Sequence, residues 1–367
     1  MVGALPVSPL APANFPDLPV IDGVQFASVA AEVRYTGRRD VMLALLAPGT
    51  SVAGVFTRSS TRAAPVLDCQ DKLRGADAAE ASNGAAILVN AGNANAFTGA
   101  HGQASVAEIT AAVAQASAVP QSRVFTASTG VIGEKLPHDR ILAKLDALVD
   151  GLSPDGAAEA ARAIMTTDTF PKGACAVVDI DGQPVRISGF AKGSGMIAPD
   201  MATMLVYIFT DARIEQAPLQ ALLARLNEQT FNCITVDSDT STSDTLMLAA
   251  TGHSGVAVEG VAAFEETLHR VMLDLAHQVV RDGEGATKFV EFCVRGAQSD
   301  AEAKIHARAM ADSPLVKTAI AGEDPNWGRI VMAIGKAGER AERDLVSIAV
   351  GGVEIARRGQ RVEGYDE

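Results

Sequence analysis

Aromatic residues and cysteines are scarce in this chain of 367 residues. Phe, Trp and Tyr together make up 4% of the sequence, so the core must be built mainly from Ala, Val, Ile and Leu. The four cysteines lie far apart and show no C-x-x-C spacing: Cys69, Cys175, Cys233 and Cys293. This distribution excludes a disulfide-rich scaffold and argues against a zinc site, so we expect free thiols.

Positively charged residues are also fewer than negatively charged ones. The sequence has 31 Lys and Arg against 44 Asp and Glu, and its formal net charge is −13 at pH 7. Such a protein repels polyanions, so neither nucleic acid nor an anionic membrane surface is an expected partner. No run of about 18 apolar residues occurs, and the first residues lack the basic and apolar regions of a signal peptide. We expect a cytoplasmic protein with no membrane association.

Apolar runs rich in β-branched residues alternate with segments of helical periodicity. The expected strands are Ala85–Asn90, Val124–Ala127, Ala174–Ile180, Leu205–Phe209, Thr245–Ala250, Lys288–Val294, Ile330–Ile334 and Leu345–Val350. Helical spacing covers residues 141–149, 219–229 and 264–279, and Ser105 with Glu108 predicts a capping box. This order favours a layered α/β fold with helices outside a mixed sheet.

A hairpin is expected at Asp181-Gly182, a residue pair suited to a type I′ turn between two strand-like runs. The hairpin argues against a purely parallel sheet. No internal repeat, low-complexity block or linker rich in Pro and Ser divides the chain, so the sequence predicts one compact unit.

The most unusual segment is a Gly-rich loop that leads through a proline turn into an apolar strand, Lys192-Gly-Ser-Gly-Met-Ile-Ala-Pro-Asp-Met-Ala-Thr203. An N-to-O acyl shift at Thr203 would free an α-amine beside its hydroxyl. An amine with a pKa of about 7.7–8.0 can act as the general base for that hydroxyl. Two alternatives stay open: a Thr that merely opens a strand, and a loop at Lys192 that cradles a phosphate.

Other polar loops follow apolar runs. Residues 126–133 are small, hydroxylic or Gly, and they fit either an oxyanion-binding turn or a strand-to-helix turn. The three Asn in residues 90–99 are typical of turns. Residues 237–245 lack the Gly and Glu of a calcium loop, and the six histidines form no metal triad or convincing Ser-His-Asp set.

These segments, in this order, resemble the ornithine acetyltransferase family of arginine biosynthesis. Besides the Thr203 loop, the resemblance is carried by residues 23–27, 54–57, 63–66, 90–99, 128–133, 166–169, 237–245, 313–319 and 322–329. It implies the layered α/β sandwich shared with N-terminal-nucleophile aminopeptidases. It also implies autoproteolysis between Ala202 and Thr203. The α chain of residues 1–202 and the β chain of residues 203–367 would stay together as one compact unit within a heterotetramer.

The resemblance further implies which residues form the site. Thr203 would be the nucleophile, and the remaining site residues would be the oxyanion-hole pair Thr129 and Gly130 and the substrate contacts Thr169, Lys192, Thr203 and Glu284. An acetyl-Thr203 intermediate would carry the acetyl group from N2-acetyl-L-ornithine to L-glutamate. No metal or bound cofactor is expected, and whether acetyl-CoA is a further donor stays open. From charge alone we infer that Lys192 meets the substrate carboxylate and Glu284 the ornithine ammonium.

The sequence departs from the family at three places. Asp200 and Ser243 stand where members usually have Asn. Members normally continue for some tens of residues and end in an Asn-x-x-Tyr tail with substrate contacts, so we expect either a fragment or a site without those contacts.

Two rival functions stay open. One is an N-terminal-threonine amidase or aminopeptidase, with water in place of glutamate. The other is a phosphate or nucleotide binder.

Overall fold

A computed structural model describes residues 6–75, 82–198 and 204–366. The chain divides into two compact units, Met1–Ala286 and Thr287–Glu367. No change of composition marks this boundary in the sequence. Within the described residues, no helix is both long and apolar enough to cross a membrane.

The larger unit contains two mixed sheets. The four-stranded sheet has the order β1 (Val24–Val29), β2 (Val41–Leu46), β4 (Ala85–Asn93), β5 (Val124–Val131), with β4 and β5 parallel. The five-stranded sheet has the order β3 (Ser51–Phe56), β9 (Thr245–Ala250), β8 (Leu205–Thr210), β7 (Gln183–Lys192), β6 (Lys172–Ile180), with β8 and β9 parallel. All other strand pairs are antiparallel.

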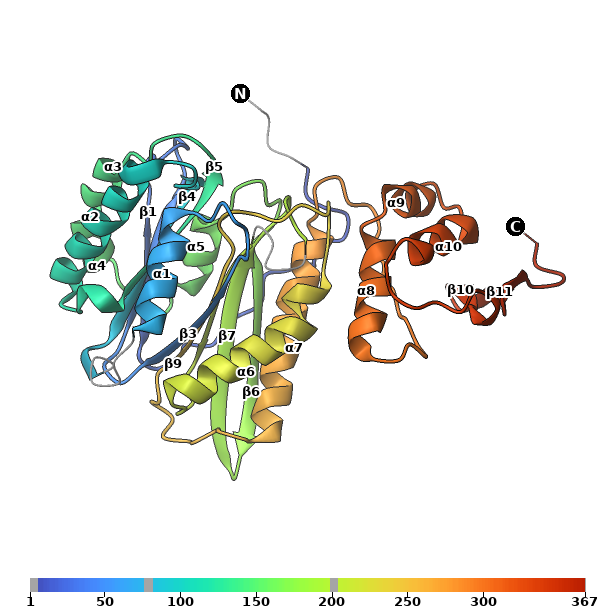
Figure 1. Cartoon of the computed structure of the whole chain (residues 1–367). Helices are drawn as coiled ribbons and strands as arrows, with labels where there is room; N and C mark the ends of the chain where they lie inside the picture. Colours follow the sequence, from blue (N-terminus) through green and yellow to red (C-terminus); the bar gives the residue numbers. More distant parts are fainter. Residues whose placement is uncertain (1–5, 76–81, 199–203, 367) are drawn as a thin grey trace. The chain divides into compact units, whose positions relative to one another are not determined.

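The helices of the larger unit are α1 (Ala64–Arg74), α2 (Gly99–Ser117), α3 (His138–Leu142), α4 (Leu145–Asp150), α5 (Ala157–Ala163), α6 (Gln216–Gln229) and α7 (Ala262–Arg281). Short 3-10 turns cover Gln121–Arg123 and Phe231–Cys233. Helices α2 to α4 pack on the outer face of the four-stranded sheet, and α6 and α7 on the outer face of the five-stranded sheet (Figure 1). The predicted layered α/β sandwich is confirmed.

Strands β2, β8 and β9 are almost continuously apolar because both of their faces are covered. In β8, Tyr207 and Phe209 point into the core between the sheets, whereas Val206 and Ile208 point toward α6 and α7. Phe26 of the other sheet meets Phe209 edge to face, with ring centroids 5.0 Å apart. Continuous apolar runs are the sequence pattern expected of such doubly covered strands.

Several local predictions are confirmed in the larger unit. The expected strands from Ala85 to Ala250 all exist, and Asp181 and Gly182 have φ values of 52° and 81°, as a type I′ turn requires. The capping box is wrong, because α2 begins earlier, at Gly99. Ser105 therefore lies inside the helix, and its hydroxyl donates to the His101 carbonyl.

The smaller unit contains α8 (Asp300–Ala311), α9 (Pro314–Ala321), α10 (Trp327–Gly335), a 3-10 turn at Arg343–Leu345, and an antiparallel sheet of β10 (Ile348–Val350), β11 (Val353–Arg357) and β12 (Gln360–Arg361). Two of the three strands predicted here are wrong, and the third is shorter than predicted. Residues 288–294 form no strand, and residues 330–334 belong to α10. The Asn326 side chain accepts the Arg329 N–H and so starts that helix, whereas a short apolar run alone does not separate helix from strand.

Candidate active site

Thr129 and Gly130 lie at the end of β5, where its backbone touches that of β4. Gly130 has a φ of 131°, and a Cβ at this position would lie 2.3 Å from the carbonyl carbon of Gly92 and 2.7 Å from the nitrogen of Asn93. Only Gly fits both the dihedral angle and the space. The sequence therefore places Gly here for a close backbone approach, which keeps the peptide groups after Thr129 in a fixed position.

Asparagine side chains hold this end of the sheet together. Ser128 Oγ donates to Asn90 Oδ1 (2.7 Å), and Asn90 Nδ2 donates to the Asn93 carbonyl (2.9 Å). Asn93 Oδ1 accepts the Asn95 N–H (2.8 Å), and Asn93 Nδ2 donates to the Glu134 carbonyl (3.1 Å). The prediction that these asparagines form a turn is wrong for Asn90 and Asn93, which belong to β4, and only Asn95 lies after the strand. Their side chains instead fix the strand end beside Thr129.

Lys192, from the five-stranded sheet, contacts Thr129 of the four-stranded sheet. It is the last residue of β7, its side chain is buried, and its Nζ donates to Thr129 Oγ1 (3.2 Å). Burial and the charge of Lys172 lower the pKa of Lys192, against the opposing effect of Asp168, Asp244 and Glu284. The structure thus joins two of the predicted site residues, Thr129 and Lys192.

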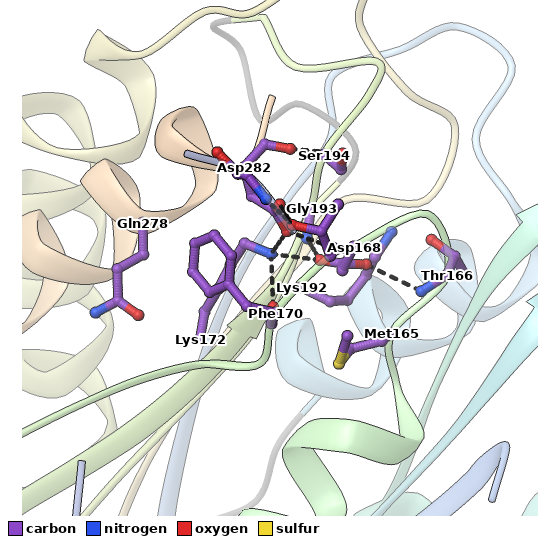
Figure 2. Close-up of polar contacts among 12 residues, drawn as sticks. Met165, Thr166, Asp168, Phe170, Lys172, Lys192, Gly193, Ser194, Gln278 and Asp282 are labelled. Atoms are coloured by element: carbon purple, nitrogen blue, oxygen red, sulfur yellow. Dashed lines mark hydrogen bonds and ion pairs between the residues drawn. The ribbon is translucent and has the colours of Figure 1, made fainter. Parts of the chain in front are cut away.

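A buried ion cluster lies behind Lys192 (Figure 2). Lys172 Nζ donates to Asp168 Oδ1 (2.7 Å) and to Asp282 Oδ2 (2.6 Å), and all three side chains are fully buried. Burial of Asp168 opposes its ionisation, but the ammonium groups of Lys172 and Lys192 and the hydrogen bonds it accepts hold its pKa below the usual value. No pattern in the sequence points to Lys172, whose side chain joins Asp168 and Asp282 from two loops far apart in the chain.

Thr169 and Glu284 belong to the same assembly. Thr169 donates through its N–H to Asp282 Oδ2 (2.9 Å) and through its hydroxyl to Asp282 Oδ1 (2.5 Å). The Glu284 N–H donates to the Ser194 carbonyl (3.1 Å), and a Cβ at Gly195 would lie 2.7 Å from Glu284 Oε1. The exposed Glu284 carboxylate therefore lies directly over the Gly-rich loop.

Three backbone N–H groups of this loop already donate to carboxylates. Asp168 Oδ1 accepts the Gly193 N–H (2.6 Å), and Asp237 accepts the N–H groups of Met196 (2.6 Å) and Ile197 (2.9 Å). A phosphate would compete with these anions and would face Glu284 as well. The phosphate-binding interpretation of the loop is therefore disfavoured.

Ala202, Thr203 and Asp200 lie outside the described residues. The described chain resumes at Met204, whose N–H donates to Asp244 Oδ1 (3.1 Å) and whose carbonyl accepts the Thr245 N–H (3.1 Å). Leu205 then pairs with Lys192 across β7 and β8. Burial raises the pKa of Asp244 well above its usual value, although the Met204 N–H and Lys192 favour its ionised form. In the sequence Asp244 was only one of several acids in a polar loop.

The described residues contain no group of three or more His, Cys, Asp or Glu arranged to hold a metal ion. The site consists instead of one buried lysine beside a hydroxyl, a second lysine between two carboxylates, and a glycine whose backbone position is fixed.

Comparison with known proteins places these residues in a wider context. A family model described as "ArgJ family" matches residues 25–367. The arginine biosynthesis bifunctional protein ArgJ of Ruegeria pomeroyi is 68% identical over 362 residues, which cover 98% of this chain and 88% of that protein. The protein of the same name from Gluconobacter oxydans is 56% identical over 373 residues, covering 100% of this chain and 86% of that protein.

Among solved structures, one similar chain is the ornithine acetyltransferase of Mycobacterium tuberculosis, determined in complex with ornithine. It is 35% identical, with a TM-score of 0.43, and the match covers 50% of this chain and 95% of that chain. An L-aminopeptidase D-Ala-esterase/amidase from Ochrobactrum anthropi matches 74% of this chain and 89% of its own, at 12% identity and a TM-score of 0.42.

Proposed function

The chain belongs to the ArgJ family, and on this basis we propose that it transfers the acetyl group of N2-acetyl-L-ornithine to L-glutamate. The observation that carries the proposal is the contact of Lys192 Nζ with Thr129 Oγ1, beside the strand that begins just after Thr203. This contact joins Thr129 at the end of β5 to Lys192 at the end of β7, which pairs with Leu205, the first residue of β8.

The first half of the proposed reaction forms an acetyl-enzyme. Thr203 Oγ attacks the acetyl carbonyl carbon while the α-amine of Thr203 takes the hydroxyl proton. The tetrahedral oxyanion accepts hydrogen bonds from Thr129 and Gly130. Its collapse breaks the bond between the acetyl carbon and nitrogen, and the departing ornithine amine takes the proton from the Thr203 amine.

The second half reverses these steps with glutamate. The glutamate amine attacks the acetyl ester, and its proton returns through the α-amine to Thr203 Oγ, which leaves as the restored hydroxyl. Both halves pass through the same oxyanion, so one set of donors serves both. No metal or bound organic cofactor takes part in this proposal.

Lys192 supports the oxyanion donors. Its Nζ donates to Thr129 Oγ1, so the proton of the Thr129 hydroxyl is available for the oxyanion. The positive charge nearby also makes that hydroxyl a stronger donor. Glu284, with its exposed carboxylate, suits the side-chain ammonium of ornithine, and the substrate carboxylate is assigned to Lys192 by charge.

The proposal includes self-cleavage between Ala202 and Thr203, which would create the α-amine. Residues Ile187–Lys192 of β7 pair with Leu205–Thr210 of β8, and β3 pairs with β9. An α chain of residues 1–202 and a β chain from residue 203 would thus remain hydrogen-bonded through two strand pairs. Assembly into a heterotetramer and a cytoplasmic location stay predictions.

Product analysis tests the proposal against its main rival. Purified protein is incubated with N2-acetyl-L-ornithine, with and without L-glutamate, and the products are quantified by mass spectrometry. We expect ornithine and N-acetylglutamate in equal amounts when glutamate is present, and no product from Thr203→Ala. Rapid release of acetate and ornithine, unchanged by glutamate, would instead identify an amidase. A parallel incubation of glutamate with acetyl-CoA shows whether this second donor is used.

A further inference from the structure

The hydroxyl of Thr169 has limited hydrogen-bonding capacity left. A threonine hydroxyl has one proton to donate and can accept two hydrogen bonds. Its proton is directed to Asp282 Oδ1, 2.5 Å from Oγ1, and Oγ1 accepts the N–H of Ser8 at 2.9 Å. Counting the described neighbours, Oγ1 can accept one more hydrogen bond and can donate none.

The direction of this hydroxyl is set by Lys172. Asp282 Oδ2 accepts both the Lys172 ammonium (2.6 Å) and the Thr169 N–H (2.9 Å), and the Lys172 and Asp282 side chains are fully buried. A buried ammonium requires carboxylates to balance its charge, so both oxygens of Asp282 act as acceptors. The Thr169 proton is thereby fixed on Asp282 (Figure 2 shows the Lys172 and Asp282 contacts).

Thr169 is connected to the Lys192 loop through its neighbour Asp168. Its side chain is half-buried, and its neighbour Asp168 accepts the Gly193 N–H beside Lys192. A substrate group that reaches Oγ1 must therefore be a donor. The carboxylate and carbonyl groups of an acetylated amino acid cannot fill this place, whereas an N–H can.

We propose that Asp282, held by Lys172, is a positioning residue that presents Thr169 Oγ1 as the acceptor for the N–H of the nitrogen that loses or gains the acetyl group. This inference rests on the proposed function, in which the acetylated nitrogen of ornithine and the amine of glutamate take the same place in turn. Both carry N–H protons, so one acceptor serves both half-reactions. Acetate esters of hydroxy acids lack this donor and would bind less well.

Asp282→Asn tests the inference because it should turn the proton of the Thr169 hydroxyl away from residue 282. Two donors, the Lys172 ammonium and the Thr169 N–H, face the position of Oδ2, so the amide oxygen must occupy it. The amide NH2 then faces Thr169 Oγ1 and donates to it. With the Ser8 N–H, both acceptor positions are filled, and the hydroxyl proton turns toward the substrate.

The measurement is steady-state transfer with the complete chain, with active sites counted from the burst of acetyl-enzyme. For Asp282→Asn we expect KM for N2-acetyl-L-ornithine to rise by about tenfold to a hundredfold, with little change in kcat per active site, since the lost contact exists in the ground state and the transition state alike. Thr169→Val should show the same rise, and the double variant no further rise. Thr169→Ser, which keeps the hydroxyl, should retain the KM of the parent.

Other outcomes separate the hypotheses. A merely structural role for Asp282 would reduce the number of active sites and the Tm while leaving KM unchanged, which would overturn the inference. A parent protein that transfers no acetyl group to glutamate would overturn the proposed function and the inference with it.

A second comparison applies if Asp282→Asn does not fold. The parent, Thr169→Ser and Thr169→Val are compared with N2-acetyl-L-ornithine and its N2-methyl analogue, which lacks the N–H. Methylation should raise KM about tenfold or more in the parent and in Thr169→Ser, and clearly less in Thr169→Val. An equal effect in all three would refute the role of Thr169 as acceptor.

Discussion

Replacing Lys172 with Met should destabilise the larger unit severely. The change removes the ammonium that bonds Asp168 at 2.7 Å and Asp282 at 2.6 Å, and both carboxylates remain fully buried. Removing one partner of a buried ion pair typically costs about 3–5 kcal/mol, because an unpaired charge is left inside. The Asp168 carboxylate still has the Lys192 ammonium nearby. We therefore expect a loss of unfolding free energy within this range, and not twice that loss for the two carboxylates.

The assay is urea unfolding at pH 7, followed by circular dichroism, with the free energy of unfolding taken by linear extrapolation. Lys144→Met is a matched control because Lys144 is exposed, and a surface change of this kind alters stability by about 0.5 kcal/mol or less. A loss below about 1 kcal/mol for Lys172→Met would show that the cluster contributes little to stability and would refute the reasoning.

The pH dependence of the free energy of unfolding provides a second test of this prediction. A carboxyl whose pKa is lowered in the folded protein, as that of Asp168 is, stabilises the fold above its unfolded pKa of about 3.9 and loses this effect as the pH falls. In Lys172→Met the Asp168 carboxylate has lost a positive partner that lowers its pKa, so it becomes easier to protonate in the folded protein. The stability gap between the parent and Lys172→Met should therefore shrink as the pH is lowered from 7, and a gap that widens would contradict the assignment.

Three further predictions concern the proposed reaction. Denaturing mass spectrometry should show two chains, beginning at residues 1 and 203, and one uncut chain for Thr203→Ala; active protein that stays intact would refute the α-amine mechanism. Gly130→Ala should lower kcat by roughly a hundredfold to a thousandfold by displacing an oxyanion donor, whereas Gly133→Ala, also at positive φ but with open space around the Cβ, should retain far more activity. Glu284→Gln should weaken the binding of N2-acetylornithine more than that of N-acetylglutamate, and equal losses of affinity for the two would exclude a contact with the ornithine ammonium.

The sequence predicted those parts of the fold that depend on local patterns. Strands β4, β8 and β9 were found because both of their faces are covered and their sequences are continuously apolar. The Asp181-Gly182 turn was found because two adjacent residues determine it. Residues 330–334 were mistaken for a strand because the cap that makes them helical lies at Asn326, before the apolar run.

The site was predictable in part for a different reason. Thr129 and Lys192 were named through a resemblance of ordered motifs, and the structure brings them together although 63 positions separate them. Lys172 was missed because its partner Asp282 lies 110 positions away, and no spacing along the chain expresses such a contact. Asp244 was missed because only its burial distinguishes it from the other acids of its loop.

The order of the five-stranded sheet determines how the protein would behave once its chain is cut before Thr203. The second chain would supply two adjacent inner strands, β9 and β8, and the first chain the strands on either side, with β3 next to β9 and β7 and β6 next to β8. Neither chain would contain the complete five-stranded sheet, so the two could not be exchanged or separated without disrupting it. Unfolding would be a first-order process at any dilution, whereas refolding would require two chains to meet. The cut enzyme would therefore persist in dilute solution through slow unfolding, and it would rarely recover once unfolded.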